Sequence, residues 1–78
     1  MNKKYIVAEI SKTWANAEYD DGKALLNTQF EQVINTNLDR GYKLHEWKLS
    51  NLLYNWTDPD GKETAYIQET IIAIFERI

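Results

Sequence analysis

Apolar and polar positions divide the chain into three strand-like stretches and one helical stretch. Residues 4–10 read Lys-Tyr-Ile-Val-Ala-Glu-Ile, and their β-branched and aromatic side chains are typical of a strand. Tyr5 and Val7 fall on one face of this strand, whereas Ile6 and Ala8 fall on the other. Because a strand that is apolar on both faces is usually covered on both, we expect other elements to enclose it.

The next regular pattern is that of an amphipathic helix. Apolar residues recur on one helical face at Leu26, Phe30, Val33, Ile34 and Leu38. Thr28 and Glu31 have the spacing of a capping box, although the helix could also begin earlier, near Lys23. Gly41 should end the helix, since glycine adopts the left-handed conformation without strain.

A long hairpin completes the chain. Residues 42–57 and 63–78 have the apolar content of strands, and the Asp-Pro-Asp-Gly-Lys sequence between them is typical of a turn. We expect a bulge or a break in the first of these strands near residues 50–51. A register centred on Asp60 gives three pairs that the structure can test, namely Trp47–Ala73, His45–Phe75 and Tyr54–Tyr66.

These elements predict an α+β fold with the order β-α-β-β. The last strand is the most apolar, so we expect it in the middle of a three-stranded mixed sheet, antiparallel to both neighbours. The first and second strands then run parallel and are joined by the helix as a right-handed crossover. The result is a sheet with a long C-terminal hairpin and one helix on one face.

We expect the helix to cover the face that carries Trp47, Leu49 and Leu53, which leaves the other face of the sheet bare. The large side chains expected on that face are Leu52, Tyr54, Trp56, Tyr66, Ile72 and Ile74. An exposed apolar patch of this kind usually marks an interface, and symmetric self-association is its commonest form. We therefore expect a homo-oligomer, a dimer or higher, with these six residues in the interface.

The composition narrows the function classes. The chain has 78 residues, 44% hydrophobic and 27% charged, which suits a single domain over residues 1–78. No apolar run approaches the roughly 20 residues of a membrane span and no signal-peptide pattern is present, so we expect a cytoplasmic protein without membrane contact. A net charge of −3 argues against nucleic acid as a partner. The lack of cysteine excludes disulfides, thiolate metal sites and a cysteine nucleophile.

No motif marks a catalytic or metal site. The glycine-rich phosphate and dinucleotide motifs and the nucleophile elbow are all missing from the sequence. His45 is the only histidine, so a zinc site would depend on carboxylates. We therefore expect a protein that is not an enzyme and that uses no cofactor or metal. The alternative is a small enzyme that works with carboxylates or with a metal held by residues 18–21.

Aromatic side chains suggest one candidate ligand site. Residues 11–22 lose periodicity and turn acidic, so we expect a loop there. Trp14 and Tyr19 lie in this loop, and Lys12 and Lys23 are close to them in sequence. Bases stack on such rings and lysines hold phosphates, so these four residues could bind a nucleotide-like small ligand. Core packing and oligomer contacts also account for the aromatic content.

Three short motifs resemble those of small bacterial and phage domain families of unknown function. They are Lys4-Tyr5-Ile6-Val7 at the start, Gly41-Tyr42-Lys43-Leu44 after the helix and Ile74-Phe75-Glu76-Arg77 at the end. The resemblance implies a small βαββ domain, often self-associating, with no assigned catalytic residues. The hairpin of this chain is longer than that pattern.

These features predict a non-catalytic, homo-oligomeric binding module. The resemblance implies an accessory protein of a phage or prophage, with an anti-defence role. Two targets remain open at this point. One is a host protein bound on a sheet face, a strand edge or the turn, and the other is a nucleotide-like small ligand sequestered between protomers.

Overall fold

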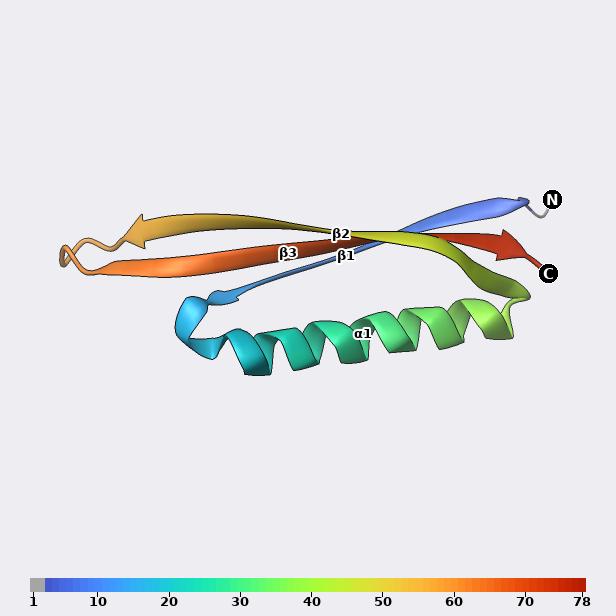
Figure 1. Ribbon diagram of the computed structural model, residues 1–78, viewed down its shortest axis with the longest axis horizontal. Helices are drawn as coiled ribbons and strands as arrows, with labels where there is room; N and C mark the ends of the chain where they lie inside the picture. Colours follow the sequence, from blue (N-terminus) through green and yellow to red (C-terminus); the bar gives the residue numbers. More distant parts are fainter. Residues whose placement is uncertain (1–2) are drawn as a thin grey trace.

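Three strands and one helix follow one another in the predicted order β-α-β-β (Figure 1). The computed structural model describes residues 3–78. β1 (Tyr5–Ala15) leads through the short 3-10 helix η1 (Asn16–Glu18) into α1 (Tyr19–Asp39). β2 (Tyr42–Thr57) and β3 (Glu63–Arg77) then form the hairpin. The α+β β-α-β-β fold predicted from the sequence is confirmed.

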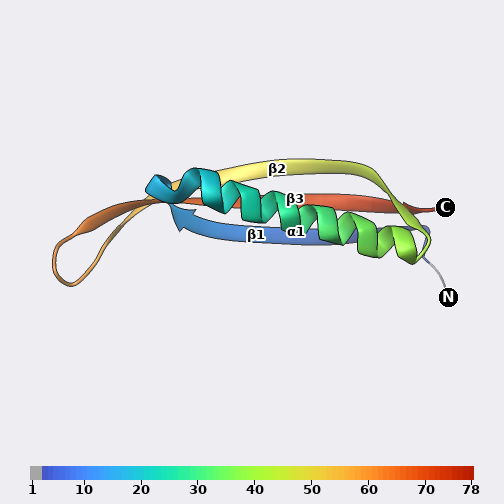
Figure 2. The same ribbon diagram turned by 90° about the horizontal axis from the view of Figure 1, so that it is seen from below.

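The sheet has the strand order β1-β3-β2, and α1 lies across one of its faces (Figure 2). The most apolar strand, β3, is in the middle as predicted, and it pairs antiparallel with both neighbours. β1 and β2 run parallel to each other but do not pair. Both ladders are antiparallel, so the expectation of a mixed sheet is wrong.

The hairpin turn forms as its residues predict. Both Asp60 and Lys62 donate their backbone N–H groups to Asp58 Oδ1, at 3.0 and 2.9 Å. Gly61 has a φ of 82°, a conformation that glycine adopts without strain. The cross-strand pairs Trp47–Ala73 and Tyr54–Tyr66 are confirmed.

The register changes once, close to the helix end of β2. A β-bulge lies between Leu44 and Glu46, so Leu44 rather than His45 opposes Phe75. The predicted His45–Phe75 pair is therefore wrong, and so is the expected irregularity near residues 50–51. The extra residue keeps Leu44 on the helix side of the sheet, where Phe75 is fully buried. His45 instead packs its ring against Tyr5, with centroids 5.6 Å apart.

The helix begins earlier than its apolar pattern suggests. It starts at Tyr19, and Thr28 donates its hydroxyl to the carbonyl of Ala24 within the helix, so Thr28 is not a cap. Gly41 ends the helix as predicted, with a φ of 88°. Its N–H donates to the carbonyl of Leu38 at 3.0 Å.

β1 extends well beyond the predicted strand. Residues 11–15 continue it, so the expectation of a loop from residue 11 is wrong. The strand persists because its inward side chain Trp14 joins the core, while Ser11 bonds across to Thr70 at 3.0 Å. The core cluster consists of Ile10, Trp14, Leu26, Ile67 and Ile71, with Phe30 and Val33 packed against it. β1 is enclosed on this side alone, since Val7 on the other side is exposed.

The molecule is long and thin, with extents of 53 × 19 × 17 Å. Its radius of gyration is 16.0 Å, whereas a compact domain of this length has about 11.5 Å. β1 ends where Ala15 opposes Tyr66, and only the two strands of the hairpin continue beyond that row. We call residues 55–65 the arm. Within residues 3–78 no helix is long and apolar enough to cross a membrane.

Candidate functional site

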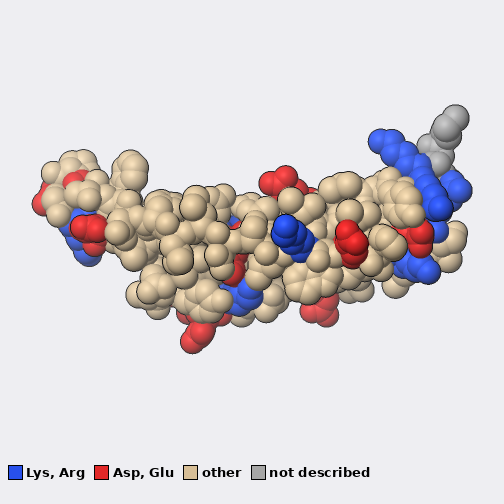
Figure 3. All heavy atoms as spheres, turned by 45° about the horizontal axis from the view of Figure 1, so that its top comes forward, with Lys and Arg blue, Asp and Glu red and all other residues tan. Residues whose placement is uncertain are grey.

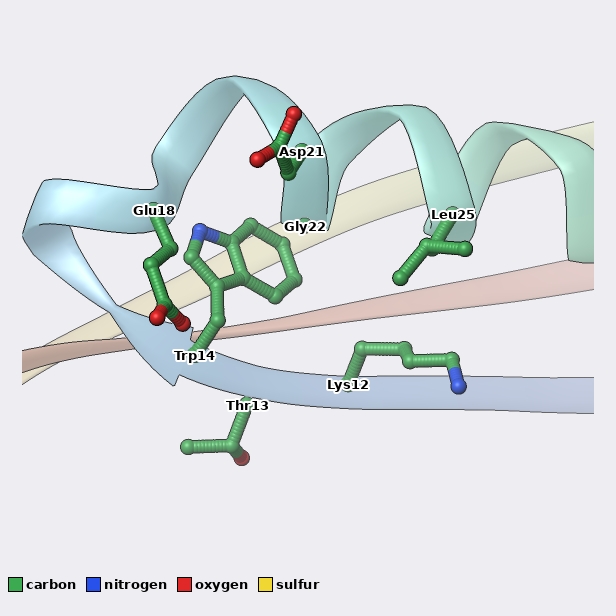
Figure 4. A pocket seen from close by; sticks show the side chains of 7 residues that line it. All are labelled: Lys12, Thr13, Trp14, Glu18, Asp21, Gly22 and Leu25. Atoms are coloured by element: carbon green, nitrogen blue, oxygen red, sulfur yellow. The ribbon is translucent and has the colours of Figure 1, made fainter.

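A pocket of about 390 Å³ lies where the end of β1 meets η1 and the first turns of α1 (Figure 4). Its lining consists of Lys12, Thr13, Trp14, Glu18, Asp21, Gly22 and Leu25. Two of the four predicted ligand residues, Lys12 and Trp14, therefore share this cavity. We refer to it as the Trp14 pocket.

Trp14 is a core residue and not an exposed stacking platform. It is only 7% exposed, because its ring lies against the backbone of Gly22 on one side. Tyr19 packs on the same indole with ring centroids 6.0 Å apart and a tilt of 60°. A base could stack on Trp14 only if these contacts opened. The indole Nε1 is buried without a hydrogen-bond partner in the part of the chain that the structure describes.

The fourth predicted ligand residue, Lys23, is already engaged. Its Nζ donates to Glu69 Oε1 at 2.8 Å, and the Glu69 side chain is 3% exposed. Lys12 stands on β1 directly opposite Glu69 in the register. Both lysines therefore lie close to one buried carboxylate. Burial of that carboxylate requires a cation, which is the structural reason for Lys23 at this position.

The charge of the Trp14 pocket does not suit a phosphate group. Glu18 and Asp21 line it together with one lysine, Lys12, so its formal charge is negative. The carboxylates would repel an anionic ligand unless a cation accompanied it. No group of three or more His, Cys, Asp or Glu residues within residues 3–78 is arranged to hold a metal ion. Glu18 and Asp21 thus remain the nearest approach to the carboxylate site of the enzyme alternative.

The second candidate site is the side of the sheet that faces away from α1, which we call the open face. It carries the odd-numbered residues of β1 and the even-numbered residues of β3 and of residues 46–56 in β2. All six residues predicted for the interface fall on it. Leu52, Tyr54, Trp56 and Ile72 are exposed, whereas Tyr66 and Ile74 are half-buried. Figure 3 brings this side forward and shows charged side chains separated by broad uncharged surface.

The polar groups near the middle of the open face bond to one another. Ser11 Oγ and Thr70 Oγ1 are 3.0 Å apart, and Gln68 donates its Nε2 to Ser11 Oγ at 3.2 Å. Beside this row, the rings of Tyr54 and Tyr66 stack with centroids 5.7 Å apart and an interplanar angle of 21°. Polar groups that already have partners cost less to bury than free ones. This polar row could therefore be covered without large desolvation losses, whereas Glu9, Glu46 and Lys48 on the same face would need partners.

The chain exposes more surface than its size requires. Its accessible area is 5863 Å², whereas a folded monomer of 9.2 kDa exposes about 4,900 Å². The excess of about 900 Å² resembles the roughly 800 Å² that each partner buries in a standard protein interface. The excess follows from the elongated shape of the chain, and it is large enough to form one such interface.

Sequence reasoning missed a third apolar surface, on the helix side of β2. Trp47, Leu49 and Leu53 were assigned to the covered side, yet all three are exposed. A helix is about 10 Å wide and strands lie about 4.8 Å apart, so one helix crossing three strands cannot cover an edge strand fully. Phe30 reaches Trp47, with ring centroids 5.5 Å apart, and covers only part of that ring. The sequence predicts only one helix for three strands, and this ratio by itself indicates that part of the helix side stays uncovered.

Comparison with known proteins adds no assignment. No family model, no curated protein and no solved structure matches this chain. The resemblance to short bacterial and phage βαββ families therefore stays a prediction.

Proposed function

We propose that this protein is a non-catalytic binding module that assembles with copies of itself through the open face. The observation that carries the proposal is the surface excess of about 900 Å² on an elongated chain. Burial of the open face in a second copy would remove apolar side chains from water, the main favourable term in association. The internally bonded polar row would keep its partners in such a contact.

A protein surface is a better candidate target than a nucleotide-like ligand. Gly22 and Tyr19 pack against the Trp14 indole, and Lys23 neutralises Glu69. The open face, in contrast, is free and wide. The host-protein target is thus retained, with a strand edge or the turn of the assembled protein as its binding surface, because self-assembly covers the open face. A phage or anti-defence role rests on the sequence resemblance alone.

Charge substitutions test the assembly. Ile72 is 43% exposed in the middle of the open face, opposite Glu9 on β1 and Lys48 on β2, so Ile72→Glu would add a charge that must leave water when the contact forms. Leu25→Glu is the matched control, since Leu25 is 62% exposed on α1, away from this face. In sedimentation velocity, we expect the wild-type protein to be oligomeric, Ile72→Glu to form smaller species and Leu25→Glu to be unchanged. A monomeric wild-type protein, or an unchanged Ile72→Glu oligomer, would contradict the proposal.

A nucleotide titration tests the choice of target. Mono-, di- and cyclic nucleotides are added while tryptophan fluorescence and Tm are followed. We expect neither signal to change, because no free basic cluster adjoins an exposed ring at the Trp14 pocket. A saturable response that Lys12→Ala abolishes would overturn this choice and favour nucleotide sequestration.

A further inference from the structure

The outer edge of β2 has the properties of a strand that lacks its neighbour. β2 lies at one edge of the sheet, and all 13 residues 45–57 are exposed. Large apolar side chains point outward from both of its faces, with Leu52 and Trp56 on the open face and Leu53 on the helix side. An edge strand presents unpaired backbone N–H and C=O groups, so a long apolar edge is a template for another strand.

Protection of this edge is confined to one end. The bulge between Leu44 and Glu46 and the charged residues Lys43, Glu46 and Lys48 all lie in the first half of β2. Residues 49–57, Leu-Ser-Asn-Leu-Leu-Tyr-Asn-Trp-Thr, contain no charge, proline or glycine. The opposite edge of the sheet differs, since β1 carries Glu9 and Lys12 along its length. Proteins normally protect exposed edges with charges, proline or bulges, so residues 49–57 have the sequence of a paired strand.

We propose that residues 49–57 pair antiparallel with the same residues of a second copy, centred on Leu53. The segment is self-complementary in this register. The uncharged residues are bounded by Lys48 at one end and Asp58 at the other. Antiparallel pairing about Leu53 sets Lys48 of each copy opposite Asp58 of the other. It also sets Asn51 opposite Asn55, Leu52 opposite Tyr54, and Leu53 opposite itself, and opposed pairs of these kinds stabilise sheets.

In this register the helix-covered faces of the two copies lie on the same side of the joined sheet. Residues opposite each other in an antiparallel ladder point to the same face, and all the proposed pairs join even with even or odd with odd positions. Both helices therefore lie on one side of a continuous six-stranded sheet. In this register Leu53 faces Leu53 of the other copy, whereas the exposed Trp47 and Leu49 of each copy lie opposite Pro59 and Thr57, in the arm of the other.

This pairing also gives the arm a structural role. Beyond the Ala15–Tyr66 row the arm is a two-stranded ribbon, which by itself is only marginally stable in water. Pairing about Leu53 lays the arm of each copy along the β2 strand of the other. Each ribbon then gains a third strand, and the charges at its ends meet opposite charges. A strand from an unrelated protein would lack this two-fold match of Lys48 and Asp58.

Cysteine cross-linking tests the register directly, because the chain has no native cysteine. Residues directly opposite in an antiparallel pair have Cα atoms about 4.5–5.5 Å apart, within the range that a disulfide spans. Leu53→Cys should therefore oxidise readily to a covalent dimer, whereas Leu25→Cys, which has similar exposure, should remain mostly reduced. Leu49→Cys and Thr57→Cys should cross-link when mixed but not separately. Equal oxidation of Leu53→Cys and Leu25→Cys would overturn the inference.

A charge at the two-fold axis tests the same contact without oxidation. Leu53 is 69% exposed, so Leu53→Glu should leave the protomer folded by circular dichroism. Two carboxylates would then face each other, and we expect the dissociation constant of the edge contact to rise about 100-fold. The inference deepens the proposed self-association but uses a different surface. An oligomer reduced by Ile72→Glu and unaffected by Leu53→Glu would overturn the edge contact alone, and the reverse result would overturn the open-face contact alone.

Discussion

Gly22 lies against the indole of Trp14, and the addition of one methyl group there tests how α1 seats on β1. A Cβ atom at this position would lie 2.5 Å from Trp14 Cγ and 2.8 Å from Cε2, with Cδ2 also in contact. Carbon atoms normally approach to about 3.5–4.0 Å. The indole would have to move by about 1 Å, and it cannot move freely because Trp14 is in the core cluster with Ile10 and Leu26.

Two opposing terms decide the effect of Gly22→Ala on the free energy of unfolding. Alanine is favoured over glycine in a helix by about 1 kcal/mol, which would raise stability. Overpacking a closed core costs about 1–3 kcal/mol, which would lower it. Because Trp14 packs against Tyr19 and belongs to the core cluster with Ile10 and Leu26, we expect the steric cost to dominate. The net loss should reach about 2 kcal/mol, or up to roughly 16 °C in Tm.

Urea unfolding followed by circular dichroism measures this loss. Protein concentration must be held constant, because assembly would shift the apparent stability. Ala24→Gly is the control that measures the difference in helix propensity between alanine and glycine without a change in the core, since Ala24 lies in the same helix and is exposed. We expect Ala24→Gly to lower stability by about 1 kcal/mol. If Gly22→Ala instead raised stability by that amount, Trp14 would not be packed beneath α1 and the Trp14 pocket would need a different description.

Three further predictions concern single contacts. Glu69→Gln removes the carboxylate that Lys23 pairs with at 2.8 Å, and the urea midpoint should report a loss of about 1–3 kcal/mol. A midpoint equal to wild type would show that this ion pair adds nothing to stability. Gly41→Ala forces an alanine to a φ of 88° and should cost about 1–2 kcal/mol by the same assay, with no gain in helix content. Asp58→Ala removes the acceptor of the Lys62 N–H, so hydrogen exchange at Lys62 should accelerate while global stability changes by less than about 1 kcal/mol; unchanged exchange would contradict the role of Asp58 in the turn.

The sequence by itself determined the hairpin, because its signals are local. Asp58 and Gly61 specify the turn through their own backbone preferences, and the turn then specifies the register of the strands beside it. Alternation of side chains across a strand assigned Tyr54 and Tyr66 to the same face without any tertiary information. The end of α1 at Gly41 could also be predicted from the sequence, because it depends on the backbone preference of a single glycine.

Only the tertiary structure decided the second half of β1. Ser11, Lys12 and Thr13 show no apolar alternation, yet each is matched by a residue on β3 that a linear reading does not reveal. Ser11 bonds to Thr70, and Lys12 stands opposite the buried Glu69. Polar residues in a strand are explained by their cross-strand partners, which lie more than 50 positions away in the chain. The expectation of a loop from residue 11 failed for that reason.

The tertiary structure also determined which part of the sheet the helix covers. The apolar pattern of β2 is the same whether a helix covers it or not, so alternation alone placed Trp47 and Leu53 in the core. The width and path of α1 leave them exposed, because one helix covers the centre of a three-stranded sheet and not its edge. Hydrophobic periodicity determines which face a side chain points to, whereas the packing of distant elements determines whether anything in the same chain covers that face.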